Sequence, residues 1–136
     1  MKRLIVYILI IGVFSLLSSC KKNRPAYTDT QVRILNTTAW TLNDCTVDPF
    51  GTFSQNPGPY SYNYGQVNVN SNSHYRAFEK IHRYSWVRLT MNNKTYYLTP
   101  YDYIGETPLS HGRYTYKISY DAATDRLGLE LVNDWA

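Results

Sequence analysis

The chain has 136 residues, of which 43% are hydrophobic and 18% are charged, and its formal net charge is +4 at pH 7. The positive charge is concentrated at one end, because 5 of the 14 basic residues but none of the 10 acidic residues precede residue 25, which leaves a net charge of −1 on the rest. A nearly neutral domain lacks the basic surface that binding to phosphate groups requires, so the composition argues against a nucleic-acid partner.

The first residues have the pattern of a secretory signal peptide. Lys2 and Arg3 come before a nearly continuous apolar run at 4–17. This run of 14 residues is shorter than the roughly 18 that a membrane-spanning helix requires. Its length and the charge before it are typical of a signal peptide instead.

The tetrad Leu17-Ser18-Ser19-Cys20 follows this run and resembles the lipobox of bacterial lipoproteins, in which one aliphatic and two small residues precede a cysteine. The resemblance implies that Cys20 receives a diacylglyceryl group on its thiol, that the chain is cut just before it, and that the new amino terminus is acylated, for example with palmitate. We therefore predict a signal peptide at 1–19, a lipidated tether at 20–29 and one domain at 30–136. The alternatives are an ordinary signal peptide, or an uncleaved anchor, with a coincidental cysteine.

The residues after Cys20 bear on location. Lys21 is not the aspartate that retains many such lipoproteins in the inner membrane, so the resemblance implies the outer membrane. Related lipoproteins sent to the cell surface often carry acidic residues here, whereas this tether is basic, so we expect the domain to face the periplasm. The basic side chains of the tether can lie against anionic lipid headgroups, at about 1 kcal/mol each.

Alternation of apolar and polar residues predicts strands throughout the domain, and no stretch has helical spacing over sufficient length. Two hairpins have the clearest pattern, one within 84–100 around Asn92-Asn93 and one within 113–134 around the turn at 121–125. The other four candidate strands are 30–36, 40–47, 65–70 and 74–81. A change of phase within 40–47 predicts a β-bulge near Asn43-Asp44. Seven to eight short strands favour an all-β, antiparallel β-sandwich of the immunoglobulin-like kind.

Cys45 is the only cysteine besides Cys20, so it has no partner for an internal disulfide. A catalytic thiolate would need a neighbouring cation, but Asp44 and Asp48 flank Cys45 and would raise its pKa. We therefore predict a buried and inert side chain.

Two long loops are predicted, at 48–65 and 100–112, and both contain tyrosines. Exposed rings in loops can stack on sugars or pack against a partner protein, and aromatic residues are enriched at interface hot spots. The candidate ligand-binding residues are therefore the loop tyrosines Tyr60, Tyr62, Tyr64, Tyr101 and Tyr103.

The order of the motifs VRILNTTAWTLNDCTV, NKTYYL, DYIGETPL and YTYKI resembles a group of small uncharacterised lipoproteins from Bacteroides-type bacteria. The resemblance extends over nearly the whole mature chain. It implies an immunoglobulin-like or transthyretin-like sandwich, and it supplies no catalytic or ligand-binding residues.

The sequence contains no arrangement of residues typical of an enzyme. The three histidines lack the spacing of a zinc site, and the turn at 121–125 lacks the alternating ligands of a calcium loop. We therefore expect neither a metal nor a cofactor. The least favoured of three hypotheses is a small hydrolase that uses Asp102, Glu106 and His111.

The leading hypothesis is a non-catalytic envelope lipoprotein that binds a partner protein or has a structural role, attached to the membrane through its lipid. The alternative is a glycan-binding module that uses the loop tyrosines. The second hypothesis predicts that both long loops meet at one end of the sandwich and expose several rings together.

Overall fold

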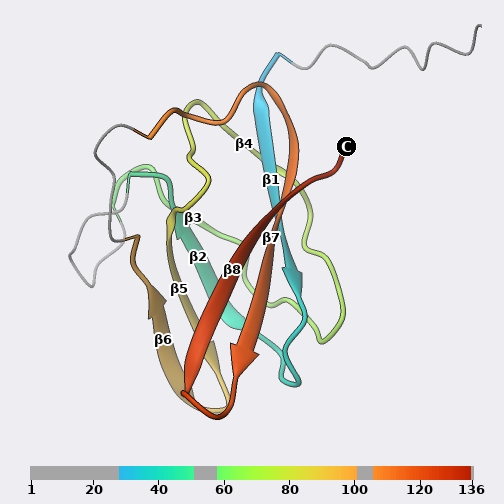
Figure 1. Ribbon diagram of the computed structural model, residues 1–136, viewed down its shortest axis with the longest axis vertical. Helices are drawn as coiled ribbons and strands as arrows, with labels where there is room; N and C mark the ends of the chain where they lie inside the picture. The colour runs from blue at the N-terminus through green and yellow to red at the C-terminus, as the bar shows by residue number, and fades with distance from the viewer. Residues whose placement is uncertain (1–27, 51–57, 101–105, 136) are drawn as a thin grey trace, which may run out of the picture.

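The computed structural model describes residues 28–50, 58–100 and 106–135, which form eight strands and no helix (Figure 1). The strands are β1 (Thr30–Asn36), β2 (Asn43–Asp48), β3 (Tyr62–Asn63), β4 (Arg76–Phe78), β5 (Trp86–Met91), β6 (Lys94–Leu98), β7 (Gly112–Asp121) and β8 (Arg126–Asn133). The predicted all-β class and the number of strands are confirmed. The described residues contain no helix with the length and apolar character that crossing a membrane requires.

The strands form two sheets of four, in the orders β4-β1-β7-β8 and β3-β2-β5-β6. Alternate residues of each sheet face the other, as the burial of Val32 and Ile34 on β1 and of Val87 and Leu89 on β5 demonstrates. Side chains of both sheets belong to a single apolar cluster, so the arrangement is that of a β-sandwich with one core.

One pair of strands contradicts the expectation of an antiparallel sandwich. β1 runs parallel to β7, from Thr30 opposite Gly112 to Asn36 opposite Ile118, whereas the other pairs between these strands are antiparallel. Alternation reveals which residues share a face but not the direction of the neighbouring strand. A parallel pair needs a long crossover, and here the chain between β1 and β7 supplies it by building the second sheet.

Both predicted hairpins are confirmed, as β5–β6 and as β7–β8. Asn92 and Asn93 have φ values of 46° and 59°, the left-handed conformations that a two-residue turn requires. The predicted bulge is also confirmed, because the register of β2 against β5 shifts between Asn43 and Thr46, and Asp44 has φ 48°.

The region between β2 and β5 differs most from the prediction. The segment 65–70 is not a strand, since only Val67 makes a bridge, to Leu42, and Gly65 and Asn70 have positive φ values that turn the chain. β3 lies instead inside the predicted loop 48–65. The candidate strand 74–81 is reduced to the three residues of β4.

The side chain of Cys45 is completely buried, as predicted. Burial removes the thiolate from water and raises the pKa of the thiol to about 12. The cause is desolvation, not the neighbouring aspartates that the sequence suggested.

At one open side of the sandwich the two sheets are joined by Asp125, which lies in the β7–β8 turn with φ 52°. Its carboxylate accepts hydrogen bonds from the Lys94 ammonium and from the hydroxyls of Tyr96 and Tyr120, each hydroxyl at 2.9 Å. In Figure 1 the tips of the β5–β6 and β7–β8 hairpins accordingly lie side by side at the bottom. Trp40 packs edge to face on the Tyr120 ring, at 5.3 Å between centroids.

Asp125→Asn is expected to lower the pKa of Tyr120. The hydrogen bond between Tyr120 and Asp125 is the main cause that raises the Tyr120 pKa from 10.0 to about 12, and the hydrogen bond to Tyr96 is the next. An anion beside a phenol opposes ionisation of the phenol. The stabilisation from this raised pKa is present below pH 10 and is lost as the pH rises through 12. Tyrosine ring NMR across the alkaline range measures the shift. Glu130→Gln, which removes an exposed carboxylate from β8, is the control, and an unchanged Tyr120 pKa in Asp125→Asn contradicts the assignment.

Candidate functional site

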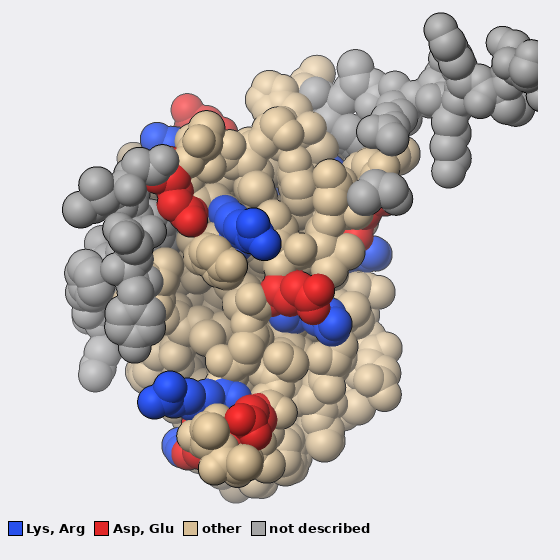
Figure 2. Space-filling model, in the orientation of Figure 1, with Lys and Arg blue, Asp and Glu red and all other residues tan. Residues whose placement is uncertain are grey.

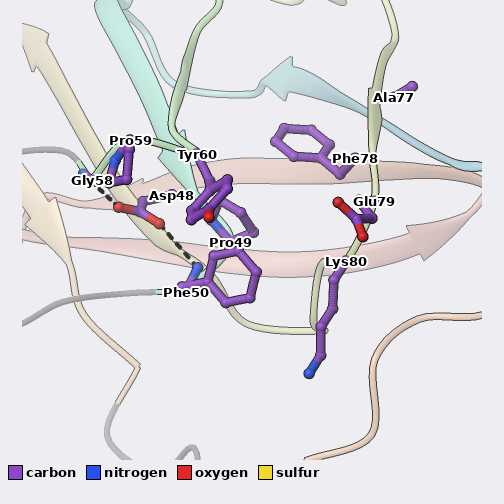
Figure 3. Close-up of a pocket in the computed structure, with 10 residues that line it drawn as sticks. All are labelled: Asp48, Pro49, Phe50, Gly58, Pro59, Tyr60, Ala77, Phe78, Glu79 and Lys80. Atoms are coloured by element: carbon purple, nitrogen blue, oxygen red, sulfur yellow. Dashed lines mark hydrogen bonds between the residues drawn. The ribbon is translucent and has the colours of Figure 1, made fainter.

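An open pocket of about 620 Å³ lies where β2 and β4 end (Figure 3). Three segments of the chain line it: the end of β2 and the residues after it, the stretch before β3, and β4 with the residues after it. The lining residues are Asp48, Pro49, Phe50, Gly58, Pro59, Tyr60, Ala77, Phe78, Glu79 and Lys80.

The carboxylate of Asp48 holds the first two of these segments together. Asp48 is the last residue of β2 and only 2% exposed, and it accepts hydrogen bonds from the amides of Phe50 at 3.0 Å and Gly58 at 2.7 Å. A Cβ atom on Gly58 would lie 2.7 Å from Oδ2 of Asp48, so a larger residue here would displace either the carboxylate or the segment. Asp48 therefore holds Phe50 directly and anchors the segment that leads to Tyr60.

Those aromatic residues, Phe50 and Tyr60, form the outer wall of the pocket. They are 44% and 67% exposed, and their rings pack edge to face with 5.2 Å between centroids. Phe78 of β4 is nearly buried and closes the pocket toward the core. The exposed ring pair and the buried carboxylate match the make-up of binding pockets, which combine apolar walls with a few placed polar groups.

Two charged side chains follow β4 at the rim of the pocket. Glu79 and Lys80 are both exposed, and neither forms an ion pair with another described residue. In Figure 3 the Glu79 carboxylate lies below Phe78, and the Lys80 side chain extends away from Ala77. The rim therefore offers both signs of charge beside an apolar surface.

Of the three predicted tyrosines that lie in the described part of the chain, Tyr60 alone lines this pocket. Tyr62 lies on β3, where its hydroxyl is 3.1 Å from Nε2 of His74 and the Arg76 guanidinium stacks on its ring at 3.8 Å. Tyr64 is 6% exposed and donates a hydrogen bond to the carbonyl of Val32 at 2.8 Å.

The prediction that Tyr64 lies on a binding surface is therefore wrong. Burial raises the pKa of its hydroxyl, which is a group of the core. Among the described loop tyrosines only Tyr60 is strongly exposed, and the ring beside it is that of Phe50, not of another tyrosine. Cys20, Tyr101 and Tyr103 lie outside the described residues.

Most of the pocket was missed by sequence reasoning. A signal was present, because DPF at 48–50 and GPY at 58–60 both place an aromatic residue directly after a proline. Nothing in the sequence indicated that Phe78, Glu79 and Lys80 of a distant strand complete the site.

Among the described residues of the hydrolase hypothesis, no ion pair joins Glu106 and His111. Asp102 lies outside the described part, Glu106 is partly buried and His111 is exposed. No group of three or more histidine, cysteine, aspartate or glutamate side chains among residues 28–50, 58–100 and 106–135 could hold a metal ion. On the face that Figure 2 shows, basic and acidic side chains are interspersed.

Comparisons of the chain with protein-family models, with curated proteins and with solved structures found no match. The site is therefore interpreted from its geometry. A pocket with apolar walls, an edge-to-face ring pair and unmatched rim charges can bind an apolar group and orient it through hydrogen bonds and charges.

Asp48→Ala is expected to lower the free energy of unfolding by about 1.5–3 kcal/mol, because two partly buried amides lose a charged acceptor. Gly58→Ala is expected to displace the same segment, since its methyl group would overlap the carboxylate. Urea unfolding measures both variants. Glu130→Ala, which removes an exposed ion pair with Lys117, is the control and should cost less than about 1 kcal/mol. Equal losses in Asp48→Ala and Glu130→Ala would show that Asp48 does not hold the pocket together.

Proposed function

We propose that this protein is a non-catalytic, lipid-anchored component of a bacterial envelope, and that its domain binds a partner protein through the pocket beside Phe50 and Tyr60. The observation that carries the proposal is the solvent-facing ring pair, held in place by Asp48 and bordered by Glu79 and Lys80. Aromatic side chains of this kind supply much of the energy at protein interfaces, and charged rims orient the partner. The attachment proposed is through Cys20, to the outer membrane on its periplasmic side.

The geometry of β1 supports a site close to the membrane. β1 begins at Thr30, whose partner in the sheet is Phe78, so the proposed tether 20–29 would reach the domain beside the pocket. Ten residues span at most about 35 Å. A partner bound at the pocket would therefore be a membrane protein or a protein close to the membrane surface.

For the fold, we propose the transthyretin-like form of the sandwich, not the immunoglobulin-like form. The immunoglobulin constant-type fold has its first and second strands in one sheet of four and only three strands in the other. Here β1 and β2 lie in different sheets, and each sheet has four strands. This difference in strand order supports the transthyretin-like form, which is the other fold that the family resemblance implies.

Mass spectrometry of the mature chain tests the attachment. The expected N-terminal residue is Cys20 with its thiol and amine acylated, and Cys20→Ser is expected to release the protein from the membrane fraction. An unmodified thiol on the mature chain contradicts the lipid anchor.

Site-specific crosslinking tests the partner. A photo-reactive residue in place of Tyr60 is expected to capture a defined envelope protein in living cells. The matched control is the same residue in place of Tyr97, which is 43% exposed on β6. Identical products from both positions, or none from position 60, contradict partner binding at the pocket.

A glycan ligand is the second candidate, because Tyr60 is both the most exposed aromatic residue among those described and a wall of the pocket. Its ring can stack on a sugar, and the Glu79 carboxylate can accept hydrogen bonds from hydroxyl groups. A glycan array tests it, with Tyr60→Ala as the variant that should lose the signal. A blank array removes this candidate.

A further inference from the structure

One wall of the pocket is the edge of a sheet. β4 is the last strand of the β4-β1-β7-β8 sheet, and β1 is its only neighbour within the described part of the chain. An edge strand leaves main-chain N–H and C=O groups available on one side, where another extended segment can add.

The hydrogen bonds of β1 determine which residue of β4 faces this open side. Ser73 donates to the carbonyl of Ile34 at 2.8 Å, and the amide of Asn36 donates to the carbonyl of Ser71 at 3.0 Å. Ile34 and Asn36 therefore direct their main-chain groups toward the β4 side. Because such groups alternate along a strand, Thr30 and Val32 do the same.

Thr30 and Val32 are opposite Phe78 and Arg76, so these two β4 residues use their main-chain groups to pair with β1. Ala77, which lies between them, directs its N–H and C=O away from β1. Ala77 also lines the pocket, although Figure 3 shows its methyl group directed away from the rings of Phe50 and Tyr60. It therefore meets the pocket through its main chain.

We infer that the pocket binds an extended polypeptide segment, which adds as a strand to the free edge of β4 through the main chain of Ala77. This inference rests on the proposed function and specifies how the partner protein is held. An apolar side chain of the segment packs against Phe50, Tyr60 and Phe78. A basic side chain next to it meets the Glu79 carboxylate, which has no cationic partner among the described residues.

The chemistry favours a polypeptide over a sugar. An extended chain presents an N–H and a C=O with the spacing needed to pair with the outward C=O and N–H of Ala77. Alternate side chains of that chain then point toward the same wall of the pocket. β4 itself has only three residues and carries no proline, so nothing in its main chain blocks an added strand.

A displayed library of random linear peptides, selected on the mature chain in detergent, tests the inference. We expect enrichment of sequences with an apolar residue next to a basic one. Glu79→Lys should change the preferred charge from basic to acidic. Phe50→Ala with Tyr60→Ala should weaken the selected peptide by more than about tenfold, because both anchoring rings are lost.

Ala77→Pro is the decisive variant. Proline removes the outward N–H but leaves every ring of the pocket, and it is tolerated on an edge strand when that N–H faces solvent. It should weaken the peptide about fivefold to tenfold, the value of one hydrogen bond. Gln31→Ala, which alters the β1 residue paired with Ala77 and leaves the free edge intact, is the control and should bind normally.

Hydrogen exchange on the unmodified protein gives a second readout that does not depend on a variant folding. The Ala77 amide should exchange rapidly in the free protein and slowly with the selected peptide. If the selected peptides do not slow exchange of the Ala77 amide and bind Ala77→Pro as well as the unmodified protein, strand addition is wrong. In that case binding at the pocket still stands. If the library yields no sequence that depends on the ring pair, or only glycans bind, the inference is overturned. The crosslink from position 60 then decides separately whether a protein partner exists.

Discussion

Asn36→Asp is expected to destabilise the domain by about 3–5 kcal/mol, because it removes two hydrogen bonds and leaves an uncompensated anion in a buried site. Asn36 is completely buried at the end of β1. Its amide nitrogen donates to the carbonyls of Trp40 at 2.8 Å and Val67 at 3.0 Å. Its amide oxygen accepts from the amide and the hydroxyl of Thr38. Aspartate keeps the acceptor but replaces the donor with an anion that faces two carbonyl oxygens.

The pH dependence distinguishes this cause from a general packing defect. A carboxyl group in this buried position ionises only at a pKa above its ordinary value, so Asn36→Asp should regain stability as the pH falls and the group becomes protonated. Urea unfolding at neutral and acidic pH measures the effect. Asn93→Asp is the matched control, since Asn93 is exposed in the β5–β6 turn and aspartate tolerates its positive φ. Equal stability of the two variants contradicts the prediction.

Tyr116→Ala is expected to cost about 3–5 kcal/mol, the range for removing a buried aromatic ring. Tyr116 is completely buried on β7, where its ring belongs to the shared core. Its hydroxyl donates to the carbonyl of His82 and lies 2.8 Å from the hydroxyl of Ser85. The residue therefore ties one sheet to the segment that leads into β5 of the other.

Tyr116→Phe separates the two contributions. It keeps the ring and removes the hydroxyl, so it is expected to cost about 1–3 kcal/mol. Tyr97→Ala, on the exposed surface of β6, should change stability by about 0.5 kcal/mol or less. Denaturant unfolding of the three variants measures these differences. A Tyr116→Phe protein as stable as the unmodified one would mean that the hydroxyl does not link the sheets.

Local sequence signals were sufficient for the elements whose partners lie next to them in the chain. The β5–β6 and β7–β8 hairpins have alternating residues on both arms and turn residues between, so their pairing follows from the sequence itself. The bulge at Asn43-Asp44 was visible as a change of phase. Each of these features depends on the conformation of only a few consecutive residues.

The remaining errors arise where distant residues decide the outcome. Tyr62 and Tyr64 alternate in the sequence, but only the packing of the two sheets determines that Tyr64 faces the core and donates to Val32 of β1. Val67 and Val69 alternate as in a strand, yet the turns at Gly65 and Asn70 leave Val69 38% exposed.

The candidate site was predicted least well, because it exists only in three dimensions. Tyr60 was identified from its residue type and its loop, whereas Phe78 at the end of β4 and Glu79 just after it reach the same pocket. Asp48 was considered only as a neighbour of Cys45. Its actual partners are the amides of Phe50 and Gly58, and the sequence does not reveal that one carboxylate joins two residues that are separated in the chain.

The parallel contact between β1 and β7 also sets an order of events during folding. The strands of the β3-β2-β5-β6 sheet all lie within residues 43–98, whereas β1 can pair with β4 but not with β7 until residues 112–118 are available. Contacts this remote in the chain raise the contact order, and proteins of this kind fold in milliseconds to seconds. A polypeptide still emerging from a ribosome or a translocation channel therefore cannot complete its first sheet, and it remains open until almost all of it has passed through.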